Sequence, residues 1–227
     1  MKKITLAFAA AALLACPAAA NVLVVRSSGP SATAYPPGHS FPDNGQVALR
    51  PGDVLTVLGG QATRTLRGPG TFPVAAGAKV AMASASRRGR FSAMRAGEVP
   101  PVPSVWHIDA SQSGKVCVAD TAKVQLWRAD ASEKVSLTLA PAGGAPRTVD
   151  WAAGKDVLDW PKDLPVASDA AYEVSWSGNP DKSKLVFATV AAAPADEQGL
   201  AKTLIAKGCQ NQLDALLETV PDAGDSH

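Results

Sequence analysis

Short runs of alternating apolar and polar residues, separated at close intervals by glycine and proline, dominate the pattern of this chain. The alternation is cleanest at residues 135–139 and 172–176, where every second side chain is apolar. A period of two is typical of strands that bury one face. Because many short strands with frequent turns are typical of sandwiches and barrels, the pattern predicts a mainly β protein.

The first part of the chain, residues 22–80, alternates strand-like and turn-like segments. The predicted strands are 22–25, 47–49, 54–58 and 62–66, and the turn signals are 28–30, 36–38, 43–45, 51–53, 59–60 and 68–70. Pro69 has no N–H to donate to a central ladder, so we expect Leu66 to end one strand and Phe72 to begin the next. We expect Leu66, Phe72 and Val74 to be buried.

A second β-rich unit is predicted at residues 105–190. Its predicted strands are 115–119, 124–128, 135–139, 147–151, 157–160, 172–176 and 184–190. So many short strands in one segment are typical of an immunoglobulin-like β-sandwich. Cys117 is the only cysteine in this unit, so the inter-sheet disulfide of antibody domains is excluded.

The pattern changes to a helical period at residues 195–220. One stripe of a helical wheel is formed by Ile205, Cys209, Leu213, Leu216 and Val220. An isolated helix of this length that contains Gly208 would be marginal in water. We therefore expect one C-terminal helix that docks on the β-domain or on a partner, followed by an acidic tail at residues 221–227.

Residues 1–20 have the pattern of a secretory signal. Lys2 and Lys3 precede an apolar run, and the alanines at 18–20 form a cleavage site. We expect cleavage after Ala20 and a periplasmic or secreted protein. The alternative is a lipoprotein signal in which Cys16 becomes the lipid-modified N-terminus. No later segment approaches the ~20 apolar residues that span a bilayer, so no membrane span is expected.

The charge of the chain argues against a nucleic-acid partner. The formal net charge of the full chain is +2, and loss of Lys2 and Lys3 makes the numbers of basic and acidic residues equal. A neutral chain lacks the excess of basic residues that nucleic-acid binding requires.

Signal cleavage would also leave an even number of cysteines. Cys117 and Cys209 then remain, and two cysteines in an oxidising compartment are candidates for a disulfide. The bond would attach the C-terminal helix to the second β-unit. The alternative is a pair of buried free thiols.

The segment VLVVRSSGPSATAYPPGHSFPDNGQVALRPGDVLTVLGGQATRTLRGPGTFPV, residues 22–74, resembles the FecR-type periplasmic domain. The resemblance implies a small β-rich extracytoplasmic module at 21–83 that is used in signal perception, often through contact with another envelope protein. The chain departs from the transmembrane regulators of that family, because it has a signal peptide in place of a cytoplasmic anti-sigma segment and a membrane helix.

A cluster of arginines occupies the segment between the two units. Arg87, Arg88, Arg90 and Arg95 lie in residues 84–104, which also contain the proline-rich stretch GEVPPVPS. The prolines predict a stiff, extended linker. The arginines are interpreted as a solvated connection, with a docking site for a polyanion or an acidic partner surface as the functional alternative.

No arrangement typical of an enzyme is visible in the sequence. His39, His107 and His227 are far apart and lie in no metal-binding or nucleophile motif. His107 and Asp109 could form a proton relay, but residues two apart on a strand merely share one face. The sequence therefore predicts no catalytic residues, no metal and no cofactor.

The second unit contains all the tryptophans: Trp106, Trp127, Trp151, Trp160 and Trp176. Most are expected in the core. Trp127 follows Leu126 and points to the opposite face of its strand, so it is the best candidate for an exposed aromatic that stacks on a sugar ring.

These observations favour a non-catalytic binding or sensing module that contacts another envelope protein. An envelope glycan-binding module, acting on a polysaccharide through exposed tryptophan, is the alternative. A hydrolase built from dispersed carboxylates and histidines is a third hypothesis.

Overall fold

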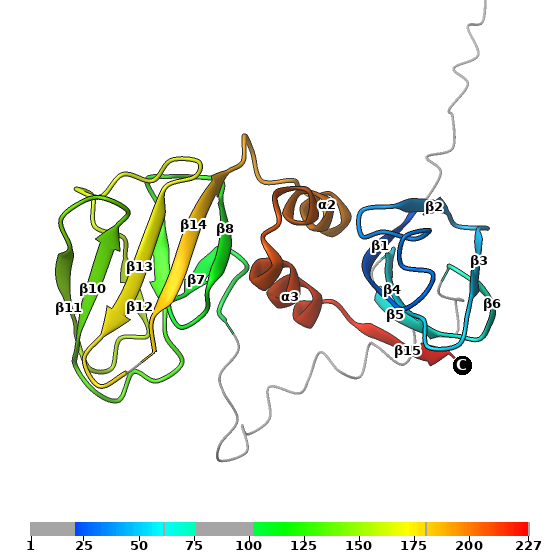
Figure 1. The fold of residues 1–227 in the computed structure, drawn as a ribbon, viewed down its shortest axis with the longest axis horizontal. Coiled ribbons are helices and arrows are strands. Elements are labelled where there is room, and N and C mark those ends of the chain that lie inside the picture. The colour runs from blue at the N-terminus through cyan, green and yellow to red at the C-terminus, as the bar shows by residue number, and fades with distance from the viewer. Residues whose placement is uncertain (1–20, 61, 76–101, 180, 227) are drawn as a thin grey trace, which may run out of the picture.

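A computed structural model describes residues 21–60, 62–75, 102–179 and 181–226. Two β-rich units lie on either side of a pair of helices (Figure 1). The mainly β fold with C-terminal helical structure is confirmed.

The N-terminal unit consists of two small sheets that share one core. The larger has the order β15-β5-β4-β1-β2, and β3 pairs with β6. The strands are β1 (Asn21–Ser28), β2 (Ser40–Pro42), β3 (Gln46–Leu49), β4 (Val54–Gly59), β5 (Ala62–Arg67), β6 (Gly70–Pro73) and β15 (Asp222–Ser226). The core includes Leu66, Phe72 and Val74, so their predicted burial is confirmed.

The second unit is a β-sandwich. A five-stranded sheet, β11-β10-β13-β14-β8, packs on a three-stranded sheet, β12-β9-β7, and side chains from both sheets form one core. The strands are β7 (His107–Asp109), β8 (Gly114–Val118), β9 (Gln125–Trp127), β10 (Val135–Pro141), β11 (Arg147–Trp151), β12 (Val157–Asp159), β13 (Ala171–Trp176) and β14 (Ser183–Thr189). The seven strands predicted in this unit are all present.

The C-terminal helical segment is two helices rather than one. These are α2 (Glu197–Lys207) and α3 (Gln210–Thr219). Gly208 lies between them with a φ of 77°, and its N–H donates to the Ile205 carbonyl. A glycine in this left-handed conformation ends a helix, because it costs no side-chain clash. The prediction of a single helix through Gly208 was therefore wrong.

The acidic tail is also ordered differently from the prediction. Residues 222–226 form β15, which pairs in parallel with β5 of the N-terminal unit (Figure 1). The tail thus adds a strand to a sheet made by the opposite end of the chain. Among the described residues, no helix is long and apolar enough to cross a membrane.

The helices share a core with both β-units. Leu23, Val25 and Leu58 of the N-terminal unit belong to the same buried cluster as Cys117 and Val190 of the sandwich. The helices contribute Ala201, Leu204, Leu213, Leu216 and Leu217 to this cluster. We call this region the helical junction. The expected docking of the helical segment on the β-domain is confirmed, and it extends to the N-terminal unit as well.

Candidate functional site

A disulfide lies at the centre of the helical junction. Cys117 on β8 is bonded to Cys209, which lies between α2 and α3; their Cα atoms are 5.8 Å apart and their sequence separation is 92 residues. Both side chains are buried. The predicted pair is confirmed, and the bond attaches the helices to the sandwich.

The side-chain amide of Gln212 closes the neighbouring sheet edge. Its Oε1 accepts a hydrogen bond from the Cys117 N–H at 2.6 Å, and its Nε2 donates to the Cys117 carbonyl at 3.0 Å. Nε2 also donates to the Val105 carbonyl at 2.8 Å. Because β8 is an edge strand, these bonds satisfy backbone groups that would otherwise be buried without partners.

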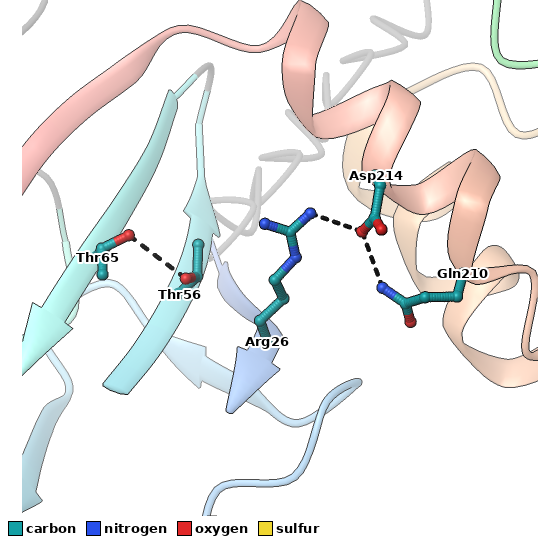
Figure 2. Close-up of polar contacts among 5 residues, drawn as sticks. All are labelled: Arg26, Thr56, Thr65, Gln210 and Asp214. Carbon is teal, nitrogen blue, oxygen red and sulfur yellow. Dashed lines mark hydrogen bonds and ion pairs between the residues drawn. The ribbon is translucent and has the colours of Figure 1, made fainter. Parts of the chain in front are cut away.

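Polar contacts join α3 to the N-terminal unit on the other side of the junction. Arg26 extends from β1 toward α3, and its Nη2 lies 2.6 Å from Asp214 Oδ1 (Figure 2). Gln210 Nε2 donates to the same oxygen at 2.9 Å. The side chains of Arg26 and Asp214 are 50% and 43% exposed, so solvent weakens the ion pair. The contact orients the helix more than it stabilises it.

Two threonines lie beside the Arg26 contact on the sheet of the N-terminal unit. The hydroxyls of Thr56 on β4 and Thr65 on β5 are 3.4 Å apart and lie near Arg26 on the same side of the strands (Figure 2). At the far end of the junction, Gln198 Nε2 donates to the carbonyls of Asn21 and Leu58. The helices are therefore held to the N-terminal unit by hydrogen bonds at both ends of the contact.

A small hollow lies where the sandwich meets α3. His107, Asp109, Lys115 and Asn211 line it, and its cavity volume of about 30 Å³ has room for one or two water molecules. Its polar side chains are engaged locally: Asp109 accepts hydrogen bonds from Ser111 and Gln112. His107 Nδ1 lies 3.1 Å from Ser104 Oγ. His107 and Asp109 thus have separate partners, which does not support a proton relay between them.

The exposure predicted for Trp127 was wrong. Its relative exposure is 3%, and Trp151 and Trp160 are buried as well. The prediction assumed that one face of the strand meets solvent, but Leu126 and Trp127 point to opposite faces of β9 and both are buried. Trp127 is thereby removed as a sugar-stacking residue.

The remaining predicted sites have different outcomes. Arg87, Arg88, Arg90 and Arg95, together with Cys16 and His227, lie outside the described residues. His39 is exposed, and its ring lies 4.5 Å from the ring of Phe41.

Buried polar side chains in the described part of the chain are used to support the backbone or the turns. The set comprises Ser31, Asp53, Thr63, Arg128, Ser183 and Gln212. Arg128, for example, donates to the carbonyls of Lys155 and Ala152 while its guanidinium lies 4.9 Å from the centre of the Trp151 ring. Among all the residues that the structure describes, no group of three or more potential metal ligands is found.

The sequence analysis missed Gln212, Asp214 and Arg26. A usable signal existed for Gln212, because it follows Cys209 by three residues and so lies on the same helical face. Arg26 and Asp214 carried no such signal, because their meeting depends on the docking of α3 against β1. No family model, curated protein or solved structure matches this chain.

Proposed function

We propose that this protein is an exported, non-catalytic binding or sensing module of the bacterial envelope, and that its partner is another envelope protein. The observation that carries the proposal is the helical junction, in which a disulfide and two helices connect the two β-units through one shared core. Two units held in a fixed relative orientation lose little conformational entropy when a partner binds to their surface.

The disulfide supports an extracytoplasmic location, because such bonds persist in oxidising compartments. Together with the signal pattern of residues 1–20, it favours the periplasm. In this proposal the N-terminal unit is a FecR-like module and the sandwich is immunoglobulin-like. The division into two β-rich units, with the boundary expected near residue 84, supports that assignment.

Partner capture tests the proposed function. The full chain with a C-terminal affinity tag is expressed with its residues 1–20, crosslinked gently in intact cells and purified from the envelope fraction. We expect one envelope protein in near-stoichiometric amount, which then binds the purified chain in calorimetry. An exported tag without the chain is the control. Recovery of the chain alone, or of a protein that fails to bind when purified, would contradict the proposal.

A further inference from the structure

The tail strand β15 pairs with β5 through its backbone. The two strands are parallel, with Asp222 opposite Thr63 and Asp225 opposite Thr65, and the register is irregular between these pairs. The Thr63 N–H donates to the Pro221 carbonyl at 2.8 Å. The ladder therefore depends on groups that any extended peptide carries.

The residue types of the tail are unfavourable for a strand. Its sequence, DAGDS, is made of residue types that are uncommon in strands or weak strand formers. Asp222 is exposed, and Gly224 has a φ of 96°, far from strand geometry. β15 contains no apolar residue larger than alanine, so a segment with better strand residues would pair more favourably with the same edge.

Strand β5 keeps its own place in the sheet on its other side. It pairs with β4 over six residue pairs, from Gly59–Ala62 to Val54–Arg67, and Leu66 is fully buried in the core of the N-terminal unit. Displacement of β15 would leave β5 paired with β4 and would expose a sheet edge of several residues. Such an edge binds extended peptides by strand addition.

The charges of the two strands indicate which peptide fits this edge. β5 carries Arg64 and Arg67, whereas the sequence of the tail contains Asp222 and Asp225. The Arg64 guanidinium donates to the neutral carbonyls of Pro73 and Ala75, so Arg64 contributes to this edge through its positive charge. We propose that the outer edge of β5 is a strand-addition site for an extended acidic segment of a partner protein, and that β15 is its internal occupant. This inference rests on the proposed binding function and assigns a surface to it. The tail competes with the partner for this edge. When the partner is absent, the tail remains paired with β5.

Tail displacement can be tested without knowing the partner. The probe is a fluorescent synthetic peptide with the sequence VPDAGDSH of residues 220–227. The receptor is the full chain carrying Gly224→Pro, because proline fixes φ near −65° and cannot adopt the conformation of Gly224. We expect the peptide to bind this variant roughly tenfold more tightly than the wild-type chain, in which the tethered tail competes at high effective concentration.

Two control peptides separate backbone pairing from charge. A peptide with proline at the positions of Ala223 and Gly224 cannot pair along its length and should not bind. A peptide with asparagine in place of both aspartates should bind more weakly, with a smaller dependence on salt. A second receptor that ends at Val220 repeats the measurement without any tail, and an intact disulfide and an unchanged circular dichroism spectrum verify its fold.

Binding of the peptide to both receptors supports the inference. The inference is overturned if a correctly folded variant receptor does not bind the peptide. It is also overturned if the wild-type chain binds the peptide as tightly as the variants do. Failure of the proposed function can be distinguished from failure of this inference. The first would be seen as the absence of an envelope partner in the capture experiment, and the second as the absence of peptide binding. A partner captured equally well by wild type and by Gly224→Pro would likewise overturn the role of the tail.

Discussion

The turn residues at 29, 50–53 and 68 lie together at one end of the N-terminal unit. The Asp53 carboxylate accepts hydrogen bonds from the N–H groups of Ser31 at 2.8 Å and Arg50 at 2.5 Å. Gly29 lies against Asp53, where an added Cβ would be 2.6 Å from a carboxylate oxygen, and the Gly68 N–H donates to the Asp53 carbonyl. These glycine-rich motifs therefore serve the packing of the turns.

Gly68→Ala is expected to destabilise the N-terminal unit strongly. An added Cβ would overlap the carbonyl of Arg50, which is backbone and cannot rotate away. We expect a loss near the upper end of the ~1–3 kcal/mol seen for overpacking, measured by urea denaturation. Gly143→Ala is the matched control: its φ is 75° and its surroundings are open, so only the backbone strain of about 1 kcal/mol applies. Equal losses in the two variants would contradict the packing argument.

Asp53 is expected to make the same turns sensitive to acid. Burial raises the pKa of Asp53, but the hydrogen bonds from Ser31 and Arg50 outweigh it and hold the pKa below its ordinary value. A carboxyl with a lowered pKa stabilises the fold above its unfolded pKa of about 3.9, and this stabilisation is lost as the pH falls through the folded pKa.

Amide hydrogen exchange tests this dependence locally. Protection of the Ser31 and Arg50 amides should fall below about pH 4 in the wild type. Asp53→Asn should reduce that protection at neutral pH and remove most of its change with pH. Asp150→Asn, at an exposed carboxylate in the sandwich, should leave both amides unchanged. Wild-type protection that persists at pH values low enough to protonate every carboxyl would contradict the role of Asp53.

At the scale of elements, local pattern predicted the strands well and the contacts between elements poorly. Alternation at β10 and β13 was informative because each of these strands has one covered and one polar face. The same logic failed for Trp127, since neither face of β9 is free. Gly208 was visible in the sequence, but only its left-handed φ shows that it ends α2. β15 could not be predicted from the sequence, because its residues are poor strand formers and its pairing with β5 depends on tertiary contact.

Gln212→Ala is expected to destabilise the attachment of α3 to β8. The substitution leaves the N–H and carbonyl of Cys117 buried without partners, and an unsatisfied buried polar group costs about 1–3 kcal/mol. Gln210→Ala, in the first turn of the same helix, removes an exposed side chain and its hydrogen bond to Asp214. Because that bond is open to solvent, the free energy of unfolding should change by less than about 0.5 kcal/mol. Urea denaturation with the disulfide intact measures both. Similar small losses in the two variants would show that water replaces the Gln212 amide.

At the scale of the whole molecule, the last part of the chain completes structures begun by the first. The helices cover Leu23, Val25 and Leu58 of the N-terminal unit, and β15 lengthens its sheet. Without residues 196–226 these apolar side chains would face water, which costs about 25 cal/mol for each Å² of apolar surface. The two β-units are therefore expected to depend on each other through the helical junction, although their own cores are separate.

The disulfide provides the test of this dependence. A variant with Cys117→Ala and Cys209→Ala should lose about 4 to 5 kcal/mol of stability in the chain-entropy account of a loop this long. Tryptophan fluorescence follows the sandwich, which holds four of the five tryptophans, and the helical junction, against which Trp106 packs. Amide exchange at Leu58 and Thr63 follows the N-terminal unit. Because the freed helices belong to a core that includes Leu58, we expect both signals to shift together. Wild-type protein treated with reductant under partly denaturing conditions should reproduce the shift. A loss confined to the fluorescence transition, with protection at Leu58 and Thr63 unchanged, would mean that the N-terminal unit is stable without a fixed junction.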